Sequence, residues 1–189
     1  MLLRWILSIR AFIRNKIFHI DDRSQWEIAL ANGMKVGKDL SIQDGVIVDV
    51  SHCWLIEIGD RVTLAPRVYL LAHDASTKRE LGYTVLGRVK IGSDVFIGAR
   101  TIVLPGVTIG DHVIIGAGSV VAHDIPSNSV AVGSPAKVIS SYSQYIEKRK
   151  NQMNICPCYD SSYTANHITD EKRDQMIREI DEYKHGYVI

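Results

Sequence analysis

The chain has 189 residues, of which 46% are hydrophobic, so one domain with modest appendages can bury a substantial core. Its 22 basic and 21 acidic residues give a formal net charge of +1, which disfavours a nucleic-acid partner because such proteins usually carry a strong basic excess. Three cysteines are too few for a disulfide framework and favour a reducing, cytoplasmic compartment. Cys156 and Cys158 have no second Cys/His cluster at zinc-finger spacing, so we expect no metal site.

Residues 1–34 are predicted to form an N-terminal helical segment. Six apolar residues fall on one helical face, with arginines off that face: Leu2, Ile6, Ile9, Ile13, Ile17 and Ile20. The charges interrupt a membrane span, and no signal-peptide cleavage pattern follows. Two interpretations remain. The helix packs on the body or on a neighbouring subunit, or it rests peripherally on the inner face of a membrane as a basic amphipathic helix. Ser24 and Glu27 form a capping box that predicts a further short helix ending at Gly33.

A six-residue repeat dominates residues 35–139. Branched aliphatics recur at Ile91, Ile97, Val103, Ile109, Ile115 and Val121, and small or branched residues recur at Val95, Thr101, Val107, Val113, Ser119 and Ile125. Glycine follows most members of the first series. A period of six fits neither an α-helix nor a hairpin meander, whereas it fits a short strand and a sharp bend repeated many times. The pattern therefore predicts an all-β fold, the hexapeptide class of parallel β-helix.

The repeat is interrupted at "LLAHDASTKREL", residues 70–81. An insertion over residues 72–88 throws the frame out of phase, because Ile91 follows Ile58 by 33 residues, which is not a multiple of six. His73 stands at the root of this loop, where the scaffold fixes its position and the loop shapes a pocket. Histidine removes protons near neutral pH, so His73 is the candidate general base. The neighbouring Asp74 either orients its ring or caps the turn.

Residues 140–189 are predicted to form a C-terminal helical extension. A short helix is expected over 141–150, followed by an irregular connector over 151–167. The stretch "ITDEKRDQMIREIDEYKHG" predicts a longer helix that begins at Thr169 or Asp170 and ends at Gly186. The role of this extension is not indicated by the sequence.

The segment "VKIGSDVFIGARTIVLPGVTIGDHVIIGAGSVVAHDIPSNSVAVGSPAKVI" resembles the hexapeptide-repeat acyltransferases. It is most similar to the maltose, galactoside and nodulation-type O-acetyltransferases and to relatives that modify surface polysaccharides. The resemblance covers roughly residues 36–139. It implies a left-handed β-helix with three hexapeptides per turn, a homotrimer with active sites between subunits, and acetyl-CoA as the acyl donor without a metal.

The resemblance also implies which residues line the donor site. Ala99 and Ala117, 18 residues apart, are expected to stack one above the other and to lie beside the pantetheine arm. Ala122 and His123 match positions further along the cofactor, although the family often has lysine in place of His123. Lys137 matches a basic position near the nucleotide phosphates. The mechanism implied is direct transfer, in which His73 deprotonates the acceptor and no acyl-enzyme forms.

The acceptor side departs from the family pattern. Phe96 stands where sugar acetyltransferases commonly have tryptophan, Asp49 lacks its usual acidic neighbour, and Asp74 replaces a common proline after the histidine. Asp49, His52 and Asp74 are the candidate substrate-binding residues. These departures leave the acetyl donor plausible and the acceptor open.

Three functions are therefore weighed. The favoured one is O-acetylation of a sugar or surface-glycan precursor. The second is N-acetylation of an amino sugar, including a nucleotide-linked one. The third is a non-catalytic or metal-dependent β-helix, which is disfavoured because Leu55 and Ile91 supply no histidine partner for His73 one coil away.

Overall fold

The computed structural model describes residues 24–189 of the chain, and the predicted amphipathic helix over residues 1–20 lies outside this range. The described part begins with helix α2 (Gln25–Ala31). Ser24 caps this helix by accepting a hydrogen bond from the backbone N–H of Glu27, and the Glu27 carboxylate reaches back to the N–H of Ser24. The predicted capping box is therefore confirmed.

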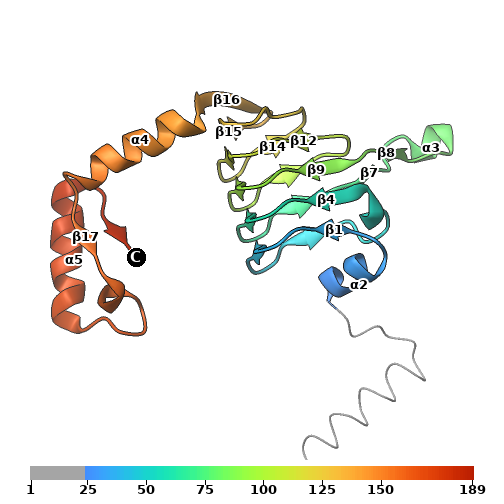
Figure 1. Ribbon diagram of the computed structural model, residues 1–189. Coiled ribbons are helices and arrows are strands. Elements are labelled where there is room, and N and C mark those ends of the chain that lie inside the picture. The colour runs from blue at the N-terminus through green and yellow to red at the C-terminus, as the bar shows by residue number, and fades with distance from the viewer. Residues whose placement is uncertain (1–23) are drawn as a thin grey trace, which may run out of the picture. The chain divides into compact units, whose positions relative to one another are not determined.

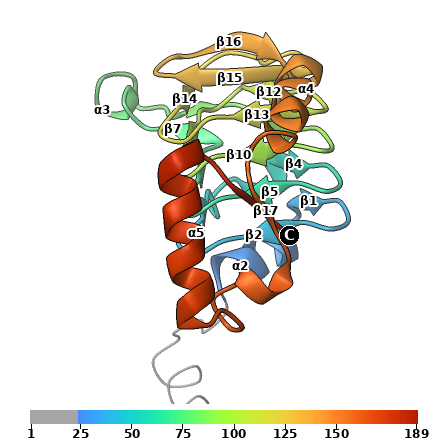
Figure 2. The same cartoon turned by 90° about the vertical axis from the view of Figure 1, so that its left-hand side faces the viewer.

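Three sheets form the body of the molecule, and their strands run parallel except that β16 (Ala136–Ser141) runs opposite to its neighbour β15 (Ser129–Gly133) (Figures 1 and 2). Sheet A consists of β1 (Lys35–Val36), β4 (Ile56–Ile58), β9 (Val89–Ile91) and β12 (Thr108–Ile109). Sheet B consists of β2 (Ser41–Ile42), β5 (Thr63–Leu64), β10 (Phe96–Ile97), β13 (Val113–Ile115), β15 (Ser129–Gly133) and β16 (Ala136–Ser141). Sheet C consists of β3 (Ile47–Val48), β6 (Tyr69–Leu70), β11 (Ile102–Val103) and β14 (Val120–Val121). Successive strands pass from A to B to C, so each circuit of the chain makes one coil of a three-sided β-helix.

The core is the interior of these coils. Both sixfold series point inward and are buried, as the repeat predicts. Two members of the second series are polar, and each finds a partner. The Thr101 hydroxyl donates to the carbonyl of Gly116, and the Ser119 hydroxyl donates to the same carbonyl and accepts from the N–H of Gly133. The buried hydroxyls are therefore satisfied, which removes most of the cost of placing them inside.

A column of glycines sets how closely the coils stack at the corner between sheets A and B. A Cβ atom added to Gly92 would lie 2.8 Å from the carbonyl carbon of Gly110 and 2.5 Å from Oδ1 of Asp111. A Cβ atom added to Gly59 would lie 2.7 Å from the carbonyl carbon and oxygen of Gly92. The glycine that follows so many strands is thus required by backbone contact between coils.

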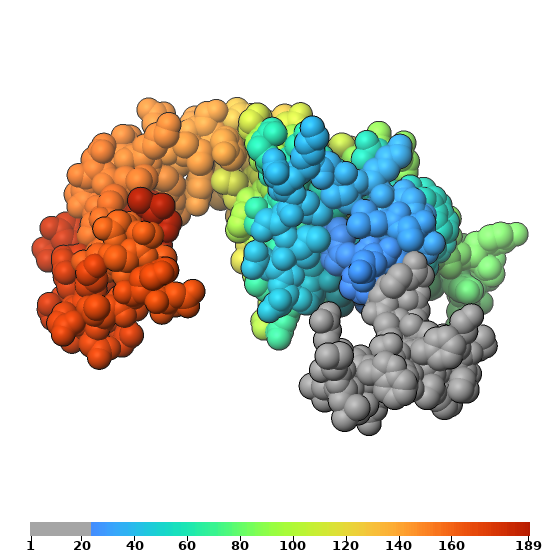
Figure 3. Space-filling view, turned by 60° about the horizontal axis from the view of Figure 1, so that its bottom comes forward, coloured from blue at the N-terminus to red at the C-terminus, as the bar shows by residue number. Residues whose placement is uncertain are grey.

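Every departure from the six-residue spacing falls at the corner between sheets C and A, called here the C–A corner. Along the chain, ten residues separate Val48 from Ile58, and 21 separate Leu70 from Ile91, although each pair occupies equivalent positions on sheets C and A. The first excess forms the 3-10 helix η1 (Cys53–Leu55). The second forms a hairpin of β7 (His73–Asp74) and β8 (Val85–Leu86) around helix α3 (Lys78–Leu81), which stands out from the coils in Figure 3.

Residues 140–189 form a second compact unit. It contains α4 (Tyr142–Met153), β17 (Cys158–Tyr159), η2 (Ser161–Tyr163), α5 (Asp170–Tyr183) and β18 (Tyr187–Val188). Thr169 caps α5 as expected, but the helix ends at Lys184 in the left-handed conformation rather than at Gly186. The connector is less irregular than expected, because β17 pairs in parallel with β18.

Within residues 24–189, no helix combines the length and apolar character that crossing a membrane requires.

Candidate active site at the C–A corner

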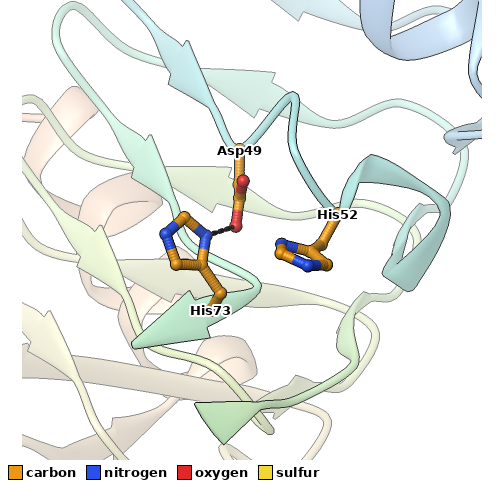
Figure 4. A group of neighbouring side chains, drawn as sticks. All are labelled: Asp49, His52 and His73. Atoms are coloured by element: carbon orange, nitrogen blue, oxygen red, sulfur yellow. Dashed lines mark hydrogen bonds and ion pairs between the residues drawn. The ribbon is translucent and has the colours of Figure 1, made fainter. Parts of the chain in front are cut away.

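Three side chains of ligand or proton-transfer type converge at the C–A corner (Figure 4). Asp49 follows β3, His52 precedes η1, and His73 opens the hairpin on β7. Each contributes one nitrogen or oxygen atom, and these atoms all lie within 4.8 Å of one another. The two extra lengths of chain therefore meet at one place because consecutive coils carry them at the same corner.

The Asp49 carboxylate holds the His73 ring in place. Its Oδ2 atom lies 2.5 Å from Nδ1 of His73 and accepts a hydrogen bond from the N–H of Ala72 at 3.1 Å. Its Oδ1 atom accepts from the N–H of Ser51 at 3.1 Å. The Asp49 side chain is only 2% exposed, whereas that of His73 is 35% exposed. A carboxylate only accepts, so Nδ1 carries the hydrogen, and Nε2 keeps the lone pair that a general base needs.

His52 lies beside this pair. Its ring centroid is 5.2 Å from that of His73 and 5.5 Å from that of Trp54, which it meets edge to face. The Nδ1 atom of His52 is buried and has no hydrogen-bond partner in the structure. Trp54 itself is 55% exposed. The corner thus combines an imidazole held by a carboxylate, a buried nitrogen without a hydrogen-bond partner and an exposed aromatic ring.

Of the two alternatives that the sequence leaves open for Asp74, orienting the His73 ring or capping the turn, the structure shows the second. Asp49, a candidate for binding the substrate, has both its oxygens hydrogen-bonded to Ser51, Ala72 and His73. The carboxylate of Asp74 accepts from the N–H of Ser76 at 2.8 Å, and this hydrogen bond lowers the pKa of Asp74. Asp74 therefore caps the hairpin turn, and the residue that orients the His73 ring is Asp49.

Sequence reasoning missed the Asp49–His73 contact because 24 residues separate the two. Only the stacking of coils joins them, through the pairing of Val48 with Leu70. Extending the weak early trace of the repeat across the ten-residue gap would have placed Asp49 directly beneath the strand that leads to His73.

Two of the predicted donor residues, Ala99 and Ala117, occupy a different corner. Phe96 pairs with Ile114, and the N–H of Gly118 donates to the carbonyl of Ala99 at 2.8 Å, so Ala99 and Ala117 stack as the repeat predicts. They lie at the corner between sheets B and C, beside a hollow of about 490 Å³ lined by Asp44, Gly45, Pro66, Arg67, Ala99 and Arg100.

The remaining predicted donor residues lie elsewhere on the same unit. Ala122 and His123 follow β14 at the C–A corner, and Lys137 is exposed on β16. One chain therefore brings His73 together with Asp49 and His52, but it places Ala99 and Ala117 at another corner.

Comparison with known proteins relates this chain to the hexapeptide-repeat transferases. The model of the bacterial transferase hexapeptide family (six repeats) matches residues 88–123. Protein CapG of Staphylococcus aureus is 42% identical over 123 residues, which cover 61% of this chain and 70% of that protein.

Two solved structures add to this. A hexapeptide-repeat acetyltransferase from Vibrio cholerae, solved in complex with acetyl-coenzyme A, matches with a TM-score of 0.53 and 28% identity, covering 58% of this chain and 61% of that chain. A maltose O-acetyltransferase from Clostridium difficile matches with a TM-score of 0.50 and 34% identity, covering 65% of this chain and 78% of that chain. The β-helix of such proteins is left-handed, which is the hand that the repeat class implies.

Proposed function

This chain belongs to the bacterial hexapeptide-repeat transferase family and acts as an acyltransferase, and from that premise we propose that it moves the acetyl group of acetyl-CoA to a hydroxyl of a sugar or surface-glycan precursor. The observation that carries the proposal is the buried Asp49 carboxylate bonded to Nδ1 of a half-exposed His73. This arrangement leaves a basic nitrogen facing an open corner of a rigid scaffold.

The proposed reaction is direct transfer. Nε2 of His73 takes the proton of the acceptor hydroxyl as its oxygen attacks the thioester carbonyl carbon. The carbon–sulfur bond then breaks, and the proton on His73 passes to the departing CoA thiolate. Asp49 stabilises the imidazolium while it carries that proton. General-base assistance of this kind contributes about 10²–10⁴ in rate.

The surroundings of His73 support a sugar as the acceptor. A pyranose presents hydroxyls at its edge and an apolar face above its ring. The indole of Trp54 is an exposed flat surface, and His52 between Trp54 and His73 has a buried nitrogen without a partner. We propose that the sugar ring lies on Trp54 and that His52 binds one of its hydroxyls.

The separation of base and donor residues supports a trimer. His73 and Ala99 lie at different corners, so a base and a pantetheine arm meet only where two subunits lie side by side. The outward residues of sheet C are all apolar, namely Ile47, Tyr69, Ile102 and Val120, whereas those of sheet A are Lys35, Glu57, Lys90 and Thr108. We propose that sheet C faces the neighbouring subunit, because burying its apolar side chains away from water stabilises the assembly more than burying the charged face of sheet A.

The proposed membrane contact of the N-terminal segment is tested separately. If residues 1–20 form a basic amphipathic helix on a membrane, the full chain floats with vesicles containing anionic lipid and a chain that lacks residues 1–20 does not. Vesicles of neutral lipid serve as the control and are expected to bind less. Equal flotation of the two chains would contradict membrane contact.

The acceptor is identified by following free thiol released from acetyl-CoA in the presence of a panel of sugars and nucleotide-sugars. We expect release to depend on one class of sugar and to vanish in His73→Ala, whose affinity for acetyl-CoA stays near that of the native protein. Treating the product with hydroxylamine separates the alternatives, since it cleaves an ester and spares an amide. Full turnover by His73→Ala would reject the base assignment.

A further inference from the structure

We propose that Asp49, His52 and His73 form a binding site for a zinc-like divalent cation, and that occupation of this site switches the transfer reaction off. Two imidazoles and one carboxylate are a ligand set that Zn²⁺ prefers in proteins. The three side chains already offer their ligand atoms within 4.8 Å of one another (Figure 4).

To accept the ion, His52 moves closer to the other two ligands, and Nδ1 of His73 moves about 0.9 Å away from Oδ2 of Asp49, from 2.5 Å to about 3.4 Å. Ligand bonds of about 2.1 Å in a tetrahedral site place ligand atoms about 3.4 Å apart. His52 supplies much of the movement, since its Nδ1 atom has no hydrogen bond to break and the residue stands outside the regular coil, before η1. Asp49 stays fixed by the N–H groups of Ser51 and Ala72, which orient its carboxylate as backbone donors orient the ligands of metal sites.

The cation takes the place of the hydrogen between Asp49 and His73. Oδ2 of Asp49 already accepts from Ala72, so its remaining lone pair faces Nδ1 of His73. A neutral imidazole that binds a cation through Nδ1 carries its hydrogen on Nε2. No proton is gained or lost overall, but Nε2 is no longer able to accept one.

The switch follows from this tautomer. The cation binds Nδ1 of His73, which faces Asp49, whereas the transfer reaction uses Nε2, which faces the acceptor. Zinc therefore blocks transfer by removing the base, and it also takes up the His52 nitrogen that the proposed function assigns to a sugar hydroxyl. This inhibitory consequence rests on the proposed function, whereas the cation site itself does not.

The test uses the full chain without an affinity tag, in a Cys156→Ser, Cys158→Ser background that removes the two thiols of the second unit. Equilibrium dialysis with Zn²⁺ alone is expected to show one ion per chain, and Co²⁺ is expected to give the visible absorption of a tetrahedral complex. His52→Ala and His52→Asn should each weaken binding about 10- to 100-fold. The matched control is His185→Ala, which removes an exposed histidine far along the chain and should leave the affinity unchanged.

Binding that is absent, or equally tight in His52→Ala and the parent, would overturn the site. In the transfer assay, Zn²⁺ is expected to lower kcat at the concentrations that fill the site, and EDTA is expected to restore it. Full activity of a zinc-loaded chain would overturn the switch. A chain that binds zinc but transfers no acetyl group when metal-free would support the site and reject the proposed function, so the two failures are distinguishable.

Discussion

At the scale of single residues, the carboxylate of Asp49 determines which nitrogen of His73 is free to act. In Asp49→Asn the amide can present N–H groups to Nδ1, so the ring turns to the tautomer with its hydrogen on Nε2. We expect kcat to fall by about 10²–10⁴, with the affinity for acetyl-CoA unchanged. Steady-state kinetics and a direct binding assay measure the two quantities.

The matched variant is Asp74→Asn. This carboxylate adjoins the same histidine in the chain but is hydrogen-bonded to the N–H of Ser76. Its kcat is expected to stay near the native value. A large loss in Asp74→Asn together with a small one in Asp49→Asn would reverse the assignment made here.

At the scale of elements, the close stacking of coils predicts how the glycine column responds to a methyl group. Gly92→Ala forces a Cβ atom against the backbone of the coil above, which moves only if two coils separate. We expect a loss of about 3 kcal/mol in the free energy of unfolding, at the upper end of overpacking. Denaturant unfolding measures it.

The control for this substitution is Gly82→Ala at the end of α3. Gly82 has φ of +75° but open space around it, so the variant carries only backbone strain, about 1 kcal/mol. If Gly82→Ala costs as much as Gly92→Ala, conformational freedom rather than contact between coils explains the glycines.

In the second unit, residues 140–189, the stability is expected to depend on pH through one buried tyrosine. Burial, followed by the hydrogen bond that the Tyr159 hydroxyl donates to Glu179 at 2.9 Å, raises the pKa of Tyr159 to about 12. A phenol in an unfolded chain has a pKa of about 10. Because the folded pKa is the higher one, this contribution to stability is complete below pH ~10 and disappears as the pH rises toward ~12.

We therefore expect Tyr159 to ionise near pH 12, about two pH units above the ordinary value of a phenol, as a late step in a tyrosinate absorbance titration. Helical circular dichroism should fall together with that late step. Tyr159→Phe removes the step because it has no proton to lose. A titration in which Tyr159→Phe loses an early-ionising group instead would contradict the burial argument.

The structure agrees with the sequence prediction where the six-residue repeat continues and differs from it where the repeat is interrupted. Every sixth residue from Ile58 to Leu70 and from Ile91 to Val121 is buried, so these coils follow from the pattern itself, whereas Ile42 in the first coil is 40% exposed and the repeat there is weaker. The ten- and 21-residue passages at the C–A corner have no period, so the contact between Asp49 and His73 becomes visible only when the weak first coil is aligned with the second across the ten-residue passage. The prediction that α5 ends at Gly186 is also wrong, because the backbone conformation of a single residue decides where the helix ends. Lys184 adopts the left-handed conformation that glycine usually takes, and Gly186 lies beyond it.

At the scale of the whole molecule, the apolar outer face of sheet C predicts the assembly. Ile102→Glu places a charge at the centre of this face without touching the buried interior. We expect the proposed trimer to dissociate and acetyl transfer to disappear, because His73 of one subunit and Ala99 of the next then no longer meet. Light scattering reports the mass, and circular dichroism confirms that the coils remain folded.

Lys90→Glu is the matched control, since it changes charge on the outer face of sheet A. It is expected to leave the mass and the activity unaltered. A native chain that is monomeric and fully active would contradict the proposal that the active site needs a second subunit.

The confinement of every irregular length to the C–A corner has a consequence for how such enzymes diversify. A coil re-enters its register whether six or 21 residues make that passage, so the part of the hairpin between Asp74 and Val85 can be exchanged for another while His73 and the strands above and below stay in place. Grafting this shorter segment between relatives would therefore change the loop beside His73 without removing that histidine or altering the coils.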